Sequence, residues 1–149
     1  MEHEHENVGY WIKVINDRLK AKADAELKIH NLTFTQSRVM AFLFDHGGQT
    51  TQKEIEDFLG VAHPTVVGVV SRMEKSGFVA TWLDAKDKRN KVVSLTALAR
   101  EVGQEIGRTI NEREKSMLRG LSEEEVSELF RMLSVIYGNL DSSFPPPDD

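Results

Sequence analysis

The chain has 149 residues, of which 40% are hydrophobic and 29% charged, and its formal net charge is −5. It contains no cysteine, which excludes disulfides, zinc–thiolate sites and thiol catalysis. No apolar run approaches the roughly 20 residues that cross a bilayer, and the acidic N-terminus (MEHEHENVGY) is unlike a secretory signal, so we expect one soluble, cytoplasmic domain with helical extensions.

The N-terminal part of the chain predicts two helices. An apolar stripe with spacings of three and four begins at Val8 and predicts a long helix that ends near Ile29. Thr35 is expected to cap a second helix, which Gly47 and Gly48 stop because glycine accepts left-handed backbone. The stripe consists of Val8, Trp11, Ile12, Ile15, Leu19, Ala23 and Leu27, and the second helix is expected to turn Val39, Phe42 and Leu43 inward.

Residues 51–95 predict two short helices and a β-hairpin. Thr51 and Glu54 have the spacing of a capping box, and the helix that they start ends at Gly60. Pro64 opens the next helix, where its missing N–H is harmless. After Gly77, two strands at 78–83 and 91–95 are expected to flank a polar loop at 84–90 and so form a hairpin. The residues expected to face inward are Ile55, Phe58 and Leu59 in the first helix and Val66, Val69, Val70 and Met73 in the second.

The C-terminal part predicts two further helices and a tail. Thr96 caps a long helix, which the sequence GLS at 120–122 breaks. Ser122 and Glu125 form another capping box, and the helix that follows runs to about Leu140. The Pro-rich segment at 142–149 is expected to be disordered. The apolar positions are Leu98, Val102, Ile106 and Ile110 in the first helix and Val126, Leu129, Phe130, Leu133, Ile136, Tyr137 and Leu140 in the second.

The segment 63–95 is the most basic part of the chain. It carries six Lys/Arg and three Asp/Glu, a net of +3 on an acidic protein, which indicates a polyanion as partner. Two helices joined by a short turn have the shape that enters a DNA major groove, and a hairpin with a cationic tip forms a wing. The exposed side of the second helix is expected to present Thr65, Gly68, Ser71, Arg72 and Lys75, and the wing Lys86, Lys88, Arg89 and Lys91.

Individual side chains suggest individual roles. Arg72 could form a bidentate pair with a guanine, and an arginine of the wing could enter a narrow minor groove. Asp87 could bond turn amides or hold the guanidinium of Arg89 in line. The alternatives are ordinary: many α-hairpins do not bind DNA, charged hairpin tips are often simply solvated, and Arg72 could pair with a carboxylate of its own surface. The order of the elements favours DNA binding.

Three runs, FLGVAHPTVVGVVSRMEKSGFV, DAKDKRNKVVSLT and GLSEEEVSELFRML, resemble the MarR family of winged-helix transcription regulators. The resemblance extends from the first long helix to Leu140. It implies a homodimer with interlocking terminal helices, recognition helices in two successive major grooves, wing arginines in the flanking minor grooves, and a pseudo-palindromic operator that is usually repressed. The family's base-reading positions fall on Pro64, Thr65, Val67, Gly68, Ser71 and Arg72, and its wing positions on Asp87, Lys88, Arg89 and Lys91.

The expected architecture is therefore mainly α with a small β-hairpin wing. A dimerisation helix occupies residues 1–32, the winged helix-turn-helix core 33–95, and two dimerisation helices 96–141. The apolar stripes of the long helices are too wide for the short core to cover. Leftover apolar helix surface usually finds a partner, and two-fold dimers are the commonest solution, so we expect a homodimer.

Two residues depart from the family pattern. Many members have a serine at the position of Ala62, and alanine is a poor N-cap, so His63 or the turn backbone must satisfy the helix start. Many carry a basic or polar side chain at the position of Gly68. We therefore expect little direct base reading by this helix, with more of the specificity coming from the wing and from DNA shape.

Other chemistry has weaker support. Family members often release DNA when a small aromatic or phenolic anion binds between the dimer helices and the core. Trp11, Met40 or Leu43 could line such a cleft. Such apolar residues more often belong to a core or a dimer interface, so the effector-binding residues stay unassigned. EHEHE at the N-terminus, with His3 and His5, is better interpreted as a flexible acidic terminus than as a metal site. We expect no metal, no cofactor and no enzyme, since no catalytic motif is visible. The alternatives are a helical protein–protein adaptor and a small-molecule carrier.

Overall fold

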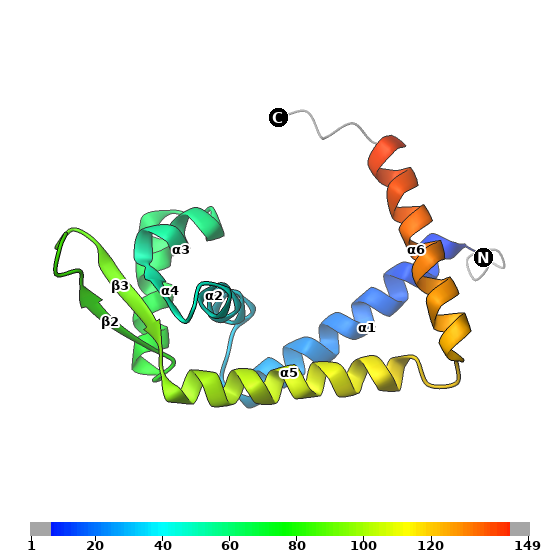
Figure 1. Cartoon of the computed structure of the whole chain (residues 1–149), viewed down its shortest axis with the longest axis horizontal. Coiled ribbons are helices and arrows are strands. Elements are labelled where there is room, and N and C mark those ends of the chain that lie inside the picture. Colours follow the sequence, from blue (N-terminus) through cyan, green and yellow to red (C-terminus); the bar gives the residue numbers. More distant parts are fainter. Residues whose placement is uncertain (1–6, 144–149) are drawn as a thin grey trace. The chain divides into compact units, whose positions relative to one another are not determined.

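The computed structural model describes the backbone of residues 7–143 and the side chains of residues 7–140. The expected flexible terminus with His3 and His5, and residues 144–149 of the expected tail, lie outside this range. Over the described residues the elements are α1 (Val8–Ile29), α2 (Phe34–Asp45), β1 (Gln49–Thr51), α3 (Gln52–Leu59), α4 (His63–Lys75), β2 (Val79–Leu83), β3 (Lys91–Leu95), α5 (Ala97–Met117) and α6 (Glu123–Ser143) (Figure 1). The fold is mainly helical with a small wing, as predicted.

The chain divides into two compact units, residues 1–106 and 107–149. The first unit contains the hydrophobic core, in which Leu43, Ile55, Met73 and Val93 are fully buried. These four side chains come from α2, α3, α4 and β3, so the core lies where the helix-turn-helix packs on the hairpin. In the second unit none of the described side chains is buried. No described helix is long and apolar enough to span a membrane.

The sheet has three antiparallel strands in the order β1-β3-β2. The predicted hairpin is confirmed, with Val79 opposite Leu95 at one end and Leu83 opposite Lys91 at the other. The strand β1 was not predicted. It has only three residues and leads directly into α3, so it is too short to show an alternating pattern, and it forms because Thr50 pairs with the distant Val93.

Hydrogen bonds at the helix starts confirm three of the four predicted caps. The capping box of Thr51 with Glu54 and that of Ser122 with Glu125 are present, and the Ala99 N–H donates to Oγ1 of Thr96. The expectation for α2 was wrong: its cap is Thr33, which exchanges hydrogen bonds with Gln36, and not Thr35. A threonine three residues before a glutamine satisfies two backbone N–H groups at once, which Thr35 cannot do in the same way.

Some predicted inward residues are exposed. Phe58 is 39% exposed because it stacks on the ring of Phe42, at 4.4 Å between centroids, at the rim of the core. In α5 the buried positions are Ala99 and Val102, whereas Leu98 and Ile110 are about half exposed. Met40 and Leu43 belong to the core and so do not line a cleft. Of the long stripe on α1 only Leu27 is buried, and Val8, Trp11, Ile12 and Ile15 are all at least 43% exposed.

Candidate nucleic-acid interface

The helix α4 follows α3 after a short turn. Gly60 ends α3 with φ of 63°, a left-handed conformation that glycine adopts without strain. The chain then enters α4, where Pro64 stands in the first turn as predicted. The predicted inner stripe is confirmed, because Val66, Val69, Val70 and Met73 are all buried in the core.

The opposite face of α4 is available to solvent. Pro64, Thr65, Val67, Ser71 and Arg72 are exposed and Gly68 is half-buried. The face combines two hydroxyl groups, one guanidinium group and a few small apolar groups, which suit base edges, phosphates and thymine methyl groups. Lys75 is exposed at the last turn of the same helix.

The start of α4 has no side-chain cap, since Ala62 offers no acceptor. The Ala62 carbonyl accepts hydrogen bonds from the N–H groups of Thr65, at 3.0 Å, and Val66, at 3.3 Å. His63 does not cap the helix either. Its Nδ1 atom lies 2.8 Å from Oε2 of Glu56 on α3, so this side chain links the two helices across the turn. No sequence pattern predicts this contact, which spans seven residues.

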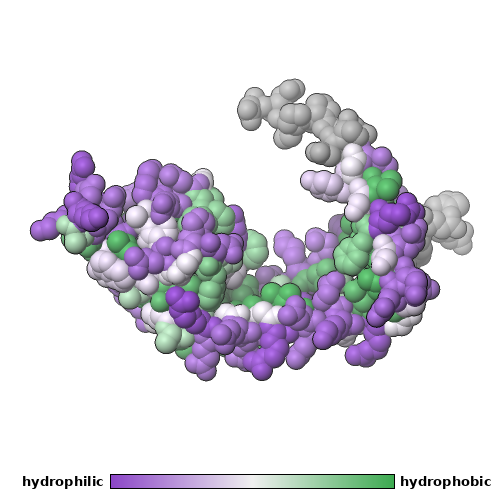
Figure 2. All heavy atoms as spheres, in the orientation of Figure 1, coloured by the Kyte–Doolittle hydropathy of each residue, from purple (hydrophilic) through white to green (hydrophobic). Residues whose placement is uncertain are grey.

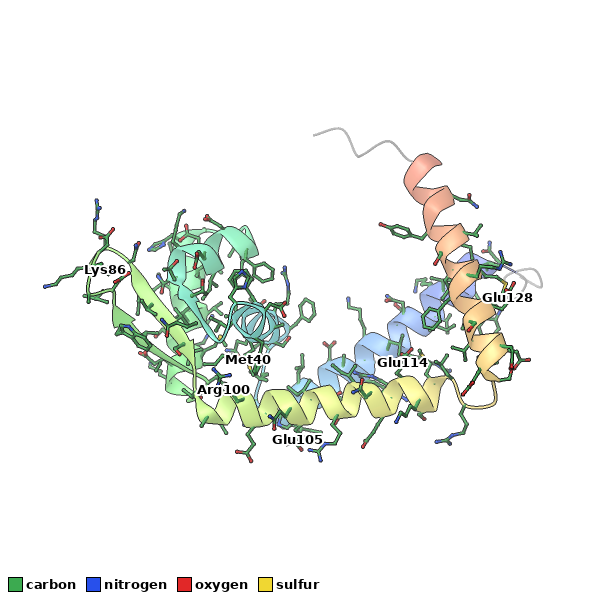
Figure 3. All side chains as sticks on the ribbon, viewed as in Figure 1. Met40, Lys86, Arg100, Glu105, Glu114 and Glu128 are labelled. Atoms are coloured by element: carbon green, nitrogen blue, oxygen red, sulfur yellow. The ribbon has the colours of Figure 1, made fainter. Side chains whose placement is uncertain are left out.

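The loop of the wing is held by its own hydrogen bonds. The Asp84 N–H donates to the carbonyl of Asn90 at 2.9 Å, and the Asn90 N–H donates to the carbonyl of Asp87 at 2.9 Å. Oδ1 of Asp84 also accepts from the N–H of Lys86 at 2.9 Å. Lys86 stands at the tip of the hairpin (Figure 3), where the surface is hydrophilic (Figure 2). These bonds give the cationic loop a defined shape.

Asp87 makes both contacts expected of it. Its Oδ1 atom accepts hydrogen bonds from the backbone N–H and from Nε of Arg89, each at 3.1 Å. These bonds hold the pKa of the Asp87 carboxyl below its usual value of 3.8, so it is ionised at neutral pH. The Arg89 side chain is nevertheless 91% exposed. Lys88 is exposed beside it, and Lys91 is half-buried at the start of β3.

The wing and the recognition helix are joined by a contact that the sequence did not reveal. The hydroxyl of Thr81 on β2 donates to Oε2 of Glu74 on α4, which fixes the hairpin against the end of the helix. Trp82, the next residue on β2, is 45% exposed. Within residues 7–140 the side chain of Arg72 has no carboxylate partner, so the alternative of a surface ion pair is not realised.

Metal and pocket chemistry have little basis in the described part of the chain. It contains no group of three or more His, Asp or Glu that could hold a metal ion. A shallow hollow at the start of α6 is lined by three glutamates, Ser127 and Arg131, a lining too acidic to attract an anion.

A helix-turn-helix whose second helix exposes polar groups, followed by a hairpin with a cationic tip, defines a winged helix-turn-helix protein. A model of the MarR family matches residues 30–90. YwoH of Bacillus subtilis (strain 168), an uncharacterized HTH-type transcriptional regulator, is 34% identical over 114 residues, which are 74% of this chain and 82% of that protein. The chain belongs to the MarR family and is a DNA-binding transcription regulator of the MarR type.

Further similarity covers most of the chain. IacR of Pseudomonas putida, an HTH-type transcriptional repressor, is 26% identical over 133 residues, 89% of this chain and 79% of that protein. The structure of the S. aureus MepR–DNA complex superposes with a TM-score of 0.78 at 27% identity, covering 89% of this chain and 98% of MepR. A second crystal structure of MepR, a transcription regulator of the Staphylococcus aureus multidrug efflux pump MepA, gives a TM-score of 0.80 at 26% identity, covering 90% of this chain and 98% of MepR.

Proposed function

We propose that the protein is a homodimeric repressor that binds a pseudo-palindromic operator and is released by a small aromatic or phenolic anion. The observation that carries the DNA-binding part is the exposed face of α4 together with the cationic wing in one compact unit. The contact of Glu74 with Thr81 keeps the two surfaces in register, so one can occupy a major groove while the other reaches the adjacent minor groove.

The proposed contacts follow from the chemistry of each side chain. On α4, Thr65 and Ser71 bond bases or phosphates, Arg72 pairs with a guanine, and Pro64 and Val67 touch thymine methyl groups, while Gly68 supplies no reading atom of its own. In the wing, Arg89 enters the minor groove, where a narrow groove concentrates negative potential. Asp87 orients that arginine, and the neighbouring lysines contact phosphates: Lys86, Lys88 and Lys91.

Dimer formation is supported by apolar helix surface that the chain leaves exposed. In the described part of the second unit no side chain is buried, although α6 alone exposes Phe130, Leu133, Tyr137 and Leu140 by at least 44%. A helix with an uncovered apolar stripe gains little stability by itself, because most helical stability in proteins comes from packing that stripe. A second copy of the chain is the proposed cover.

Repression is supported by the relatives, whereas release by an effector is inferred from the resemblance to the family. IacR is described as a repressor, and MepR as a regulator of a multidrug efflux pump. A regulator's effector must bind the DNA-free state more tightly than the DNA-bound state, so an effector that stabilises the free protein must also weaken DNA binding. Thermal-shift screening against phenolic acids, with and without operator DNA, checks this part of the proposal.

The substitution Arg89→Ala tests the wing. We expect it to weaken operator binding by about 1–3 kcal/mol and to reduce the slope of log affinity against log salt by about one, because one cation leaves the interface. The fold should be unchanged, since Arg89 contacts only the loop that carries it. Gel-shift titration at several salt concentrations between about 50 and 200 mM gives both quantities.

Arg131→Ala is the matched control. Arg131 is exposed and also pairs with a carboxylate, that of Glu128, but it belongs to α6 and is not part of the basic segment 63–95. The Arg131→Ala substitution removes the same charge and should leave the operator affinity and its salt dependence nearly unchanged. An Arg89→Ala protein with wild-type affinity would refute the wing assignment.

A further inference from the structure

The space beside Gly68 on the outer face of α4 is filled by the side chain of Arg72. A Cβ atom on Gly68 would lie 3.3 Å from Nη1 of Arg72, 3.6 Å from Nη2 and 3.8 Å from Cζ. The guanidinium therefore lies in close contact with the position that a Cβ atom would take, so a side chain at residue 68 would press against it. The absence of a side chain at residue 68 thus leaves the space in which the Arg72 guanidinium lies.

Helix geometry explains this placement. Residues four apart lie on the same face, and helical side chains lean toward the N-terminus, so Arg72 extends over the turn that contains Gly68. Its guanidinium is carried from the second half of α4 to the middle of the helix. In helix-turn-helix proteins the N-terminal part of the recognition helix contacts base edges, so the shift brings the group closer to the bases.

The charge of Arg72 is available for a ligand. The nearest acidic residue along α4, Glu74, is two positions away and accepts a hydrogen bond from Thr81. No carboxylate among the described side chains pairs with Arg72. A guanidinium presents a rigid fork of N–H donors, and the O6 and N7 atoms of guanine in the major groove match that fork.

We propose that Gly68 determines the sequence specificity of this protein indirectly, by leaving room for Arg72 to read a guanine in each operator half-site. This inference rests on the proposed function and adds a positioning residue to it. It also revises the expectation of little direct reading by α4, because the guanidinium lies beside residue 68, in the middle of the outer face of the helix.

The test compares the wild type with Gly68→Leu, Arg72→Ala and the double variant. Sites selected from random DNA give the base preference, and fluorescence anisotropy at fixed salt gives the affinity for the selected site and for its single-base variants. We expect the wild type to prefer guanine at one position of each half-site by about 10- to 100-fold. Both single variants should reduce that preference to about threefold or less, and the double variant should match Arg72→Ala.

Stability provides a readout of opposite sign. Leucine is a better helix former than glycine, so Gly68→Leu should raise Tm by about 2–5 °C while specificity falls. A damaged fold would instead lower both the Tm and the guanine preference. The proposal is overturned if the Gly68→Leu protein keeps the guanine preference. It is also overturned if adding Gly68→Leu lowers the DNA affinity of the Arg72→Ala protein as much as it lowers that of the wild type, because the leucine would then clash with DNA itself.

The two levels of inference fail differently. If the wild type binds every duplex weakly and without base preference, the proposed function fails together with this inference. If the wild type is sequence-specific but Arg72→Ala retains the guanine preference, only the assignment of Arg72 and Gly68 fails.

Discussion

Asp87 and Arg89 at the tip of the wing act as one hydrogen-bonded pair. The carboxylate binds both the backbone N–H and the guanidinium of Arg89, so the turn and the side chain are oriented together. An acidic residue beside DNA repels phosphate, and its presence is explained by the order that it gives to an otherwise flexible arginine. Because the pKa of Asp87 is lowered by these bonds, the pair persists throughout the neutral range.

Asp87→Asn should separate orientation from charge. We expect affinity for the operator to fall several-fold, because Arg89 loses the negative charge of its partner and the Oδ2 acceptor of its Nη2, while affinity for unrelated DNA stays equal or rises because one negative charge is removed. Gel-shift titrations with an operator duplex and with an unrelated duplex measure the ratio of the two affinities. Asp84→Asn is the control, because Asn retains an acceptor for the Lys86 N–H and the charge change is the same. An unchanged ratio in Asp87→Asn would contradict an orienting role.

Glu54 gives a residue-scale prediction about pH. Its pKa is lowered from 4.5, first by the Thr50 hydroxyl and then by the Thr51 N–H, both of which donate to the carboxylate. A lowered carboxyl pKa in the folded state contributes stability above the ordinary pKa, and that stability is lost as pH falls through the folded value. Glu54→Gln keeps an acceptor and removes the charge. In urea unfolding, the free energy of unfolding of the Glu54→Gln protein should be lower than that of the wild type by about a few tenths of a kcal/mol at pH 7, and the difference should vanish below about pH 4.5. A difference that stays the same at all pH values would contradict the assignment.

The helix α4 begins without the side-chain acceptor that most helices have at this position. Ala62 adopts the extended backbone of an N-cap, with φ of −60° and ψ of 144°, but contributes no hydrogen bond. The helix is instead tied to α3 by His63 and Glu56 and to the core by its valines. The helix that carries the proposed base-reading residues is thus stabilised by tertiary contacts more than by its own cap.

Ala62→Ser should therefore stabilise the protein. The serine hydroxyl can accept from the Thr65 N–H, which in the wild type donates only to the Ala62 carbonyl, and such a cap contributes about 0.5–2 kcal/mol. Urea denaturation should show a higher midpoint with an unchanged slope. Thr51→Ala is the mirror control, because it removes an existing cap on α3 and should destabilise by a similar amount. A serine variant no more stable than the wild type would show that the start of α4 is already satisfied by other groups.

How well each element could be predicted depended on the range of the interactions that form it. The bounds of α1, the capping boxes of α3 and α6, and the hairpin of β2 and β3 follow from residues a few positions apart, and all were predicted. The strand β1 was missed because three residues carry no periodicity. The start of α2 was misplaced because two threonines compete there, and only Thr33 has Gln36 at the spacing of a reciprocal cap.

At the scale of the whole molecule the first unit has a core and the described part of the second has none. In α5 and α6 apolar residues recur with helical spacing, yet Ile110, Phe130 and Leu133 are each at least 44% exposed. Exposed apolar stripes of this size mark interaction surfaces, and the proposed two-fold dimer would cover them with identical surfaces. A dimer would also place two recognition helices on one operator, which a single copy cannot do.

Leu133→Asp tests the dimer. A charge in the middle of a buried apolar interface costs several kcal/mol unless it is paired, so we expect the protein to shift from dimer to monomer at micromolar concentration. Sedimentation velocity measures the change, and affinity for a full operator should fall to that of a half-site. Ser127→Asp, which adds the same charge to the polar hollow at the start of α6, should remain dimeric. A dimeric Leu133→Asp protein would place the interface elsewhere.

The sequence by itself determined the family, the helix-turn-helix with its buried valines, and the cationic wing, because caps and periodicity act between residues at most a few positions apart. Only the tertiary structure decided that Thr50 pairs with Val93, that Phe58 stacks at the rim of the core, and that His63 binds Glu56. It also showed the Arg72 guanidinium in the space that Gly68 leaves. Spacing along a helix fixes which residues share a face, whereas the neighbours that cover that face come from distant segments and are settled only when the chain packs.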